Sequence, residues 1–326
     1  MKILFVYSGN SSTGVNTIVE TQADSLSGKS AVIEKFPLIG KGFAGYLRNI
    51  RKLSLFLAED KYDIIHAHYG LSGIISFFAK KNEKLLVSFM GDDLVGSNKS
   101  DGSIKIWSLL IARINSLFAR YFYDFSIVKS EEMKKVLLKN TKHALIPNGV
   151  NLGLFVPASM AEARLVTGDE SNKKIALFIS DPLRAEKNFK LAYDAVSLCE
   201  YEVTLKTVTK CSQDRLPSFY NATDLLILTS FHEGSPNAVK EAMSCCCPVV
   251  STDVGDVRWM FGNTPGCFIS TFDPTDVSDK IKTAVKFRKE NNFSGGRKRI
   301  KELGLDSETV SARIIEIYKS LSGRSD

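Results

Sequence analysis

The segment Phe231–Met243, FHEGSPNAVKEAM, carries two carboxylates eight residues apart, Glu233 and Glu241. Ser235 is a residue type that caps helices and Pro236 suits a first helical position, so a helix is predicted to begin here. The free N–H groups of its first turn would form an anion site. Glu241 shares a helix face with Asn237, four residues earlier, so the two carboxylates could hold two parts of one ligand. The alternative is a capped surface helix with two solvated glutamates.

Two cations, Arg184 and Lys187, lie three residues apart in ISDPLRAEKNF, directly after the apolar run Ile175–Ile179. An arginine binds oxyanions as a planar fork and a lysine as a point charge, so the pair suits a diphosphate. The alternative is two ordinary surface cations.

The first half of the chain has three further polar segments that follow apolar runs. The run Ile64–Ala67 ends at His68, without another ligand at zinc spacing. The loop with Gly14 is typical of a turn between a strand and a helix whose backbone can approach a phosphate. The dinucleotide-binding fingerprint and the P-loop lysine are absent from the sequence, which argues against binding of NAD and ATP. Asp92 and Asp93 would contact the hydroxyl groups of a substrate or hold the loop, in preference to binding a metal ion.

These segments must be positioned by buried strands. Short apolar runs without strict alternation are typical of parallel strands covered on both faces, and helical patterns lie between them. The predicted strands are Ile3–Tyr7, Ile64–Ala67, Leu85–Phe89, Phe125–Val128, Ala144–Ile146, Ile175–Ile179, Val203–Thr207, Leu225–Leu228, Val249–Ser251 and Phe268–Ser270.

The pattern starts twice, at Ile3 and at Ile175, so the fold class is α/β with two Rossmann-like, doubly wound parallel-sheet domains facing a cleft. The boundary is predicted near 147–157, giving an N-terminal domain of residues 1–150 and a C-terminal domain of residues 151–306. A last helix within about 307–326 would pack back on the N-terminal domain. The length of 326 residues also favours two domains over one core.

Composition narrows the classes of protein. With 44% hydrophobic residues and 22 Gly, the chain is neither collagenous nor disordered. The net charge of +7 lies in residues 1–150, where 20 Lys and Arg face 13 Asp and Glu. This favours an anionic partner, although no nucleic-acid module is found and no nucleic-acid partner is expected. The segment 42–58 predicts an amphipathic helix with a cationic flank, which either lies on a membrane or packs on the core.

The six cysteines show neither disulfide nor zinc spacing, and no apolar run has the length and lack of charge of a membrane span. The expected location is therefore cytoplasmic, with peripheral contact at the inner face of the cell membrane as a further expectation.

The pattern Glu233…Glu241, with Gly234 after the first glutamate and Ala242-Met243 after the second, resembles the E-x7-E motif of retaining glycosyltransferases of family 4, which have the GT-B fold. The segment 247–256, CPVVSTDVGD, is similar to the proline-strand-glycine segment of that family, and His66-Ala67-His68 to its H-x-H. The chain departs from the family at Ser180-Asp181, where Gly-Arg is common, and at Met90, where a histidine is common.

The resemblance implies roles for these residues. Glu241 would bind the ribose of a nucleotide, together with a helix start at Ser235, Pro236 and Asn237, and Gly14 would approach a phosphate. The residues implied in catalysis are Glu233, His68, Arg184 and Lys187, with the two cations acting in place of a metal ion.

The expected enzyme is a retaining, metal-independent glycosyltransferase of the hexosyl type without a cofactor. It would move a sugar from a UDP- or GDP-linked donor to a hydroxyl of a glycan or lipid-linked acceptor, in bacterial cell-surface polysaccharide or lipopolysaccharide synthesis. The alternatives are a nucleotide-sugar epimerase of the same fold and a non-catalytic sugar-nucleotide-binding subunit.

Overall fold

A computed structural model describes residues 1–10, 17–28, 31–40, 42–97, 99, 103–199 and 203–323. The chain divides into two compact units, which are treated separately below. The first unit is built within the ranges 1–97, 104–149 and 307–326, and the second within 150–306. The chain therefore enters the second unit at residue 150 and returns to the first unit for its last helix.

The first unit contains a sheet of six strands, all of them parallel, in the order β2-β1-β3-β4-β5-β6. In its register Ile3 pairs with Ile64 and Val6 with Ala67. The strands are β1 (Lys2–Ser8), β2 (Val32–Leu38), β3 (Ile64–His68), β4 (Lys84–Ser88), β5 (Phe125–Val128) and β6 (His143–Leu145).

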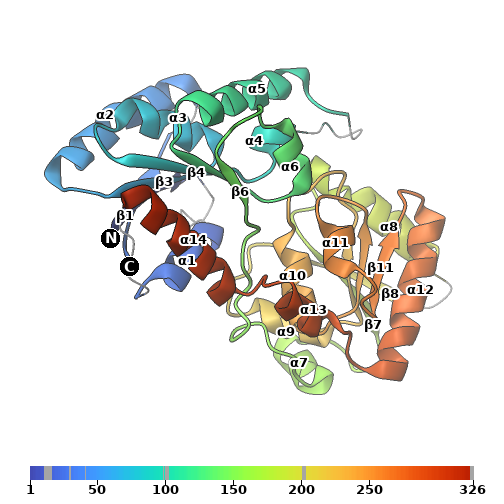
Figure 1. The fold of residues 1–326 in the computed structure, drawn as a ribbon. Helices are drawn as coiled ribbons and strands as arrows, with labels where there is room; N and C mark the ends of the chain where they lie inside the picture. The colour runs from blue at the N-terminus through green and yellow to red at the C-terminus, as the bar shows by residue number, and fades with distance from the viewer. Residues whose placement is uncertain are drawn as a thin grey trace. The chain divides into compact units, whose positions relative to one another are not determined.

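Helices cover both faces of this first sheet (Figure 1). They are α1 (Thr17–Leu26), α2 (Gly42–Glu59), α3 (Gly70–Ala79), α4 (Asp92–Val95), α5 (Ile106–Tyr121), α6 (Glu131–Val136) and α14 (Ser307–Ser322). Leu4 and Val6 of β1 pack in one core with α2 and α3. Ile3 and Phe5 point to the opposite face and pack in a second core with α1 and α14. Because successive side chains of a strand alternate between the faces, an almost wholly apolar β1 is needed to serve both cores.

Strand β2 was not predicted from the sequence. It lies at the sheet edge and pairs only with β1. Its sequence VIEKFPL carries two charges and a proline, and most of its side chains are not buried. Pro37 donates no hydrogen bond, which an edge strand tolerates. The missing signal has a physical cause, since a strand exposed at the edge does not require a continuous apolar run.

The second unit contains five parallel strands in the order β11-β10-β9-β7-β8. The strands are β7 (Lys174–Ile179), β8 (Val203–Val208), β9 (Leu225–Leu228), β10 (Val249–Thr252) and β11 (Cys267–Ser270). The helices are α7 (Met160–Thr167), a short 3₁₀ helix η1 (Ala185–Lys187), α8 (Phe189–Ser197), α9 (Leu216–Ala222), α10 (Asn237–Ser244), α11 (Val257–Phe261), α12 (Pro274–Asn291) and α13 (Gly296–Glu302).

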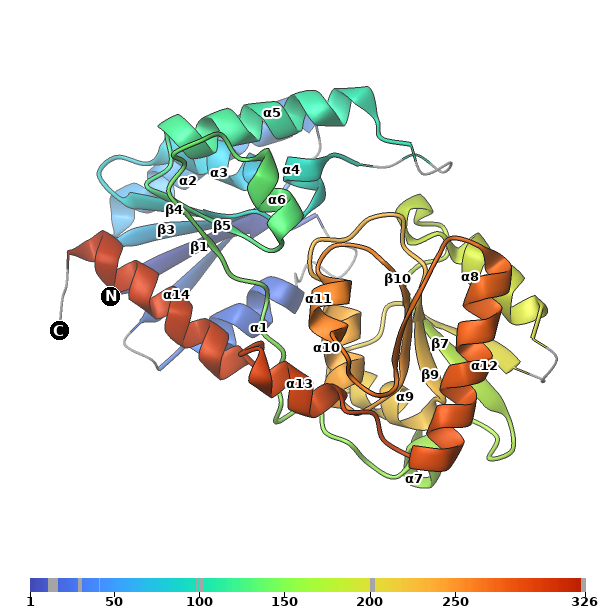
Figure 2. The same ribbon diagram turned by 45° about the vertical axis from the view of Figure 1, so that its right-hand side comes forward.

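Two cores again lie on opposite faces of the sheet of the second unit. Leu177 and Leu226 pack with side chains of α9, α10 and α11, whereas Phe178 and Leu225 pack with α8 and α12. Figure 2 shows α8 and α12 on one side of this sheet and α10 and α11 on the other. The predicted fold class, two Rossmann-like parallel-sheet domains, is confirmed for each unit.

Both sheets reverse their strand order at one point, between β1 and β3 in the first unit and between β7 and β9 in the second. In such sheets the connections from the two adjacent strands leave toward opposite faces, which opens a crevice at the carboxyl ends where ligands bind. The loops after β7 and β9 are those that carry Lys187 and Glu233.

The chain passes from the first unit to the second between residues 149 and 150, and it returns to the first unit between residues 306 and 307. The N–H of Val150 donates to the carbonyl of Leu305 at 2.9 Å. Among the described helices, none has the length and apolar character needed to cross a membrane.

Candidate functional site

An ion pair joins the two loops at the reversal point of the second unit. Lys187 Nζ lies 2.5 Å from Glu233 Oε1, and both side chains are largely buried. The hydroxyl of Ser230 donates to the same carboxylate oxygen at 2.8 Å. The two residues are 46 positions apart in the sequence. The fold therefore places Lys187, which was predicted to bind a diphosphate, against Glu233, which was predicted to bind a sugar.

Backbone contacts hold these two loops at a fixed spacing. The hydroxyl of Thr229 donates to the carbonyl of Asn188 at 3.0 Å, and the N–H of Phe231 donates to the carbonyl of Glu186 at 2.9 Å. Asn188 has a φ of 49°, in the left-handed region, which asparagine tolerates better than most residues. The chain therefore turns sharply after Lys187 and enters α8.

Helix α10 begins beside this ion pair, and a small cavity there is lined by residues that include Ser180, Lys187, Thr229, Ser230 and Ala238. The first N–H groups of an α-helix have no partner within the helix and attract anions. The crevice between the ends of β7 and β9 thus receives both a lysine and a helix start.

The predicted start of α10 was wrong by one residue. The helix begins at Asn237, its cap position is Pro236, and no side chain caps it. The Ser235 hydroxyl instead accepts a hydrogen bond from Lys240 Nζ at 3.1 Å. Asn237 Oδ1 is buried and has no hydrogen-bond partner among the described residues, which leaves a polar atom at the helix start without a protein contact.

Lys240 and Asp256 were not singled out from the sequence, yet both are buried next to this helix start. Burial lowers the pKa of Lys240 to about 8, although Asp256 and Glu241 act in the opposite direction. Burial raises the pKa of Asp256 to about 6, against the effect of Lys240. The opposite charges of Lys240 and Asp256 attract each other, which favours the charged form of both groups next to the α10 start.

Gly255 allows the loop after β10 to approach the Glu233 loop. Its φ is 57°, and a Cβ at this position would lie 2.7 Å from the carbonyl oxygen of Glu233 and closer still to that of Gly234. The N–H of Asp256 donates to the carbonyl of Gly234 at 3.2 Å. The glycine is required both for the backbone conformation and for the close contact.

We therefore expect Gly255→Ala to lower the free energy of unfolding of the second unit by about 1–3 kcal/mol. Gly168→Ala is the matched control, because Gly168 also has a positive φ of 71° but a Cβ there would contact nothing within 4 Å. Urea unfolding of both variants measures the difference. Equal losses would show that the contact with Gly234 is not tight.

Glu241 lies on α10 and is oriented by a tyrosine. The hydroxyl of Tyr220, a fully buried residue of α9, donates to Glu241 Oε2 at 2.6 Å. Burial raises the pKa of Glu241, while the Tyr220 hydrogen bond and the charge of Lys240 oppose this. Spacing in the sequence does not indicate a role for Tyr220, because Tyr220 and Glu241 are 21 residues apart and lie on different helices.

Arg184 is placed differently from Lys187. Its side chain is more than half exposed and pairs with Glu186, with Nη2 to Oε1 at 2.5 Å. The N–H of Lys187 donates to the carbonyl of Arg184 at 3.0 Å, so the two residues share one turn. The side chain of Lys187 is held in the crevice, whereas that of Arg184 pairs along its own loop, and the role of Arg184 at a diphosphate stays a prediction.

The first unit places His66 and His68 at the end of β3, with both rings buried. His66 Nδ1 lies 2.6 Å from the hydroxyl of Tyr318 in α14, and its Nε2 lies 2.7 Å from the hydroxyl of Ser88. His66 therefore fixes the strand to the last helix. His68 contacts the rings of Phe5 and His66, but neither of its nitrogens has a hydrogen-bond partner among the described residues.

Lys129, buried directly after β5, adds positive charge near these histidines. Burial is the larger cause and Lys129 the smaller in lowering the pKa of His68 to about 3. The pKa of His66 is lowered as well, chiefly by burial. The imidazole of His68 is therefore neutral at neutral pH. Sequence reasoning missed Lys129, because a lone lysine after a strand has no spacing signal.

The lowered pKa makes stability depend on pH. An unfolded histidine has a pKa near 6.5, so between about pH 3 and pH 6.5 the unfolded chain binds a proton at residue 68 that the folded chain does not. The contribution of His68 is complete above pH 6.5 and is lost as the pH falls.

We expect the free energy of unfolding of the wild type to rise with pH between pH 5 and 6 more steeply than that of His68→Leu, by about 1 kcal/mol per pH unit. Urea unfolding followed by circular dichroism at the two pH values checks this. The same slope in both proteins would mean that His68 binds a proton in the folded state.

Of the two aspartates Asp92 and Asp93, the second stabilises the loop after β4. Asp93 is buried, and its carboxylate accepts the N–H groups of Gly70 at 2.9 Å, Met90 at 3.0 Å and Gly91 at 3.0 Å. Burial raises the pKa of Asp93 to about 6, while these N–H groups oppose the change. The carboxylate joins the loop after β4 to the start of α3.

Two other sequence predictions have simple outcomes. Gly14 lies outside the residues that the structure describes. Helix α2, predicted as amphipathic, packs its apolar face inside the first unit, where Leu53 and Leu57 are buried in the core and Phe56 contacts the rings of Phe36 and Tyr62. The core-packing interpretation of this helix therefore accounts for Leu53, Phe56 and Leu57, whereas Leu47 and Leu55 are exposed.

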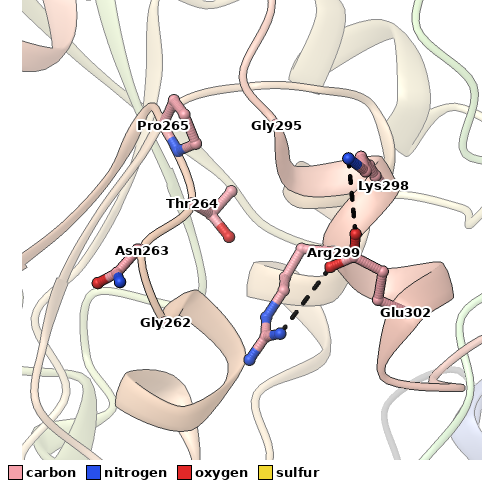
Figure 3. Close-up of a pocket in the computed structure, with 8 residues that line it drawn as sticks. All are labelled: Gly262, Asn263, Thr264, Pro265, Gly295, Lys298, Arg299 and Glu302. Carbon is pink, nitrogen blue, oxygen red and sulfur yellow. Dashed lines mark ion pairs between the residues drawn. The ribbon is translucent and has the colours of Figure 1, made fainter.

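A second hollow of the second unit contains none of the predicted site residues. It has a volume of about 470 Å³. Figure 3 shows that Lys298, Arg299 and Glu302 of α13 and the segment 262–265 line it. Glu302 carries ion pairs to both cations, at 3.8 Å from Lys298 and 3.9 Å from Arg299. Among the described residues, no group of three or more His, Cys, Asp or Glu side chains is arranged to hold a metal ion.

Solved structures with the same architecture cover the whole chain. Sucrose-phosphate synthase of Thermosynechococcus elongatus aligns with a TM-score of 0.81, at 16% identity, over 100% of both chains. Anabaena HepE in complex with UDP-glucose aligns with a TM-score of 0.77, at 19% identity, over 98% of this chain and 100% of that chain. The fold is therefore that of GT-B glycosyltransferases.

Family models and relatives agree with this class. The model described as "Glycosyltransferase Family 4" matches residues 15–154, and the one described as "Glycosyl transferases group 1" matches residues 167–299. An uncharacterized glycosyltransferase of Methanocaldococcus jannaschii is 23% identical over 90% of this chain and 86% of its own length. The putative teichuronic acid biosynthesis glycosyltransferase TuaC of Bacillus subtilis is 25% identical over 61% of this chain and 55% of its own length. The chain is a family 4-like glycosyltransferase of the GT-B type.

Proposed function

We propose that this glycosyltransferase transfers a sugar from a nucleoside-diphosphate sugar to a hydroxyl acceptor, with retention at the anomeric carbon and without a metal ion. The observation that carries the proposal is the Lys187–Glu233 ion pair at the strand-order reversal of the second unit, beside the start of α10. Support comes from Anabaena HepE, which has the same fold and was solved with UDP-glucose.

Lys187 would stabilise the leaving group. Cleavage of the bond between the sugar and the diphosphate leaves negative charge on the diphosphate oxygens, and fixed positive groups lower the energy of that state. Lys187 is held in place by Glu233, and the N–H groups at the α10 start add partial positive charge. Such an arrangement supplies the charge that a metal ion supplies elsewhere, which is the basis for proposing metal independence.

Glu241 would hold the ribose. Tyr220 occupies Oε2 of its carboxylate, so Oε1 is left to accept a ribose hydroxyl, and the tyrosine fixes the direction of that oxygen. Asn237, one turn earlier on the same helix, presents an amide oxygen that has no hydrogen-bond partner in the part of the chain that the structure describes. These two groups would position the nucleotide along α10, with its diphosphate toward Lys187.

Glu233 and His68 are assigned to the donor sugar by resemblance. Glu233 would have to exchange part of its ion pair with Lys187 for a sugar hydroxyl when the donor binds. Retention would proceed by attack of the acceptor on the same face from which the diphosphate leaves, with the departing phosphate taking the acceptor proton. A role in cell-surface polysaccharide or lipopolysaccharide synthesis is proposed from the family resemblance, and the similarity to TuaC, which is named for teichuronic acid biosynthesis, supports a polysaccharide role.

A thermal-shift screen against UDP, GDP, ADP and their sugars tests the proposal, because a ligand that binds only the folded state raises the melting temperature. We expect one nucleotide and its sugar to raise it, in the presence of EDTA as well as in its absence. With that donor, acceptor-dependent transfer is expected. The proposal would be contradicted if the product were an epimerised free nucleotide sugar, or if transfer required a divalent cation. It would also be contradicted if none of the nucleotides bound.

A further inference from the structure

Helix α5 of the first unit exposes most of its large apolar side chains, although Phe118 packs against the core. Its buried positions are occupied by small or polar residues, namely Ser108, Ala112, Asn115, Ser116 and Ala119. Its exposed positions include Ile106, Trp107, Leu109, Leu110, Ile114, Leu117 and Tyr121. This is the reverse of the usual surface helix, which turns its apolar stripe to the core.

The exposed residues form one stripe. Ile106, Leu110, Ile114, Leu117 and Tyr121 follow one another at intervals of three or four residues, which places them along one side of a helix. Ile106 is 82% exposed and Leu110 is 62% exposed. Single exposed apolar residues are ordinary, but a contiguous apolar stripe indicates an interaction surface.

Hydrogen bonds on the inner side fix the orientation of α5. Asn115 Nδ2 donates to the carbonyl of Asp93 at 2.8 Å. The hydroxyl of Ser116 donates to the carbonyl of Val136 at 3.0 Å and accepts the N–H of Leu138 at 3.1 Å. The hydroxyl of Ser108 accepts the N–H of Ser97 at 2.9 Å. Rotation of the helix to bury its apolar stripe would break these bonds.

The charges of the helix identify the partner. Arg113 and Arg120 each precede a residue of the stripe and so lie along its edge, and Lys105 stands at the cap position. The sequence of α5 contains neither Asp nor Glu. An apolar stripe bordered by cations alone complements a bilayer with anionic headgroups. Trp107 and Tyr121 lie near the two ends, and such amphipathic rings favour the membrane interface.

We propose that α5 lies flat on an anionic bilayer, with its apolar stripe among the upper acyl chains and its arginines at the headgroups. The helix has 16 residues, about 24 Å in length, which is shorter than a membrane core of about 30 Å. Its inner face is bonded into the first unit, so it docks the unit on the surface. Figures 1 and 2 show α5 on the outer side of the helical layer that covers the first sheet.

Vesicle sedimentation tests this without any sugar nucleotide, so the result is separate from the proposed donor chemistry. We expect the wild type to bind vesicles of equal parts phosphatidylcholine and phosphatidylglycerol, to bind phosphatidylcholine alone weakly, and to dissociate at high salt. Leu110→Glu with Leu117→Glu should weaken binding about tenfold or more. Leu165→Glu is the control, since Leu165 is 85% exposed on α7 of the second unit.

Tryptophan fluorescence locates the contact. The chain has two tryptophans, so Trp259→Phe leaves Trp107 as the sole reporter, and we expect its emission to shift to the blue on anionic vesicles. The proposal would be overturned if the Leu110→Glu, Leu117→Glu double variant bound vesicles as well as the wild type. It would also be overturned if the wild type did not bind vesicles. A dimer in solution that the same variant disperses would instead make the stripe an interface between copies of this chain.

Discussion

Replacing Lys187 by alanine is expected to lower the turnover of the donor by a factor on the order of 10²–10³. The ammonium group is held in the crevice by Glu233, so it needs no reorganisation when the diphosphate acquires charge. Without the lysine, the Glu233 carboxylate keeps only the Ser230 hydrogen bond among the contacts described for it. Its unneutralised charge would then repel the leaving group. Steady-state kinetics with the donor found in the binding screen measure the effect.

Lys190→Ala is the control for this experiment. Lys190 lies three residues later, pairs with Asp194, and has a side chain that is 83% exposed. We expect wild-type turnover from this variant and similar melting temperatures for both variants. A folded Lys187→Ala protein with wild-type turnover would remove Lys187 from the site.

The second large effect is expected for Glu241→Gln, which should weaken nucleotide binding about 10- to 100-fold. The substitution keeps the size of the side chain but removes the charge that strengthens a hydrogen bond to a ribose hydroxyl. Tyr220→Phe should cause a smaller loss, because the carboxylate remains but is no longer oriented. Isothermal titration calorimetry with the nucleoside diphosphate measures both.

Glu290→Gln provides the comparison, since Glu290 is an exposed residue of α12 paired with Lys286. It should bind the nucleotide as the wild type does. If Glu241→Gln has unchanged affinity, the carboxylate does not contact the nucleotide. If Tyr220→Phe weakens binding more than Glu241→Gln, the tyrosine acts on the ligand by another route than through the glutamate.

The sequence was sufficient for the buried strands, because a strand covered on both faces has to be apolar throughout. Strands β5 and β9 match their predicted bounds, and β1 and β7 differ by one residue at an end or at each end. Strand β2 escaped prediction because an edge strand can carry Glu34, Lys35 and Pro37.

The site was predicted in part. Sequence order placed Lys187 and Glu233 after two strands, but only the sheet order brings those strands together. Tyr220, Lys240 and Asp256 were not found, since the contact of Tyr220 with Glu241 and the attraction between Lys240 and Asp256 depend on packing between elements rather than on spacing. The cap assigned to Ser235 failed for the same reason, because a buried lysine took the hydroxyl.

The face of α5 was also beyond prediction. Its sequence indicates a helix, but periodicity alone suggests that the apolar stripe is buried. The inward side is decided by Asn115, whose hydrogen bond to Asp93 and close approach to Gly70 require a polar side chain inside. A helix whose buried face is polar can be recognised only when its neighbours are known.

A crystal structure of the complex with the nucleotide that binds would decide the assignment of the donor site. We predict diphosphate oxygens within hydrogen-bond distance of Lys187 Nζ and of the N–H groups at the start of α10, with a ribose hydroxyl on Glu241. A nucleotide bound elsewhere, with the Lys187–Glu233 pair intact and Glu241 touching only Tyr220, would contradict it.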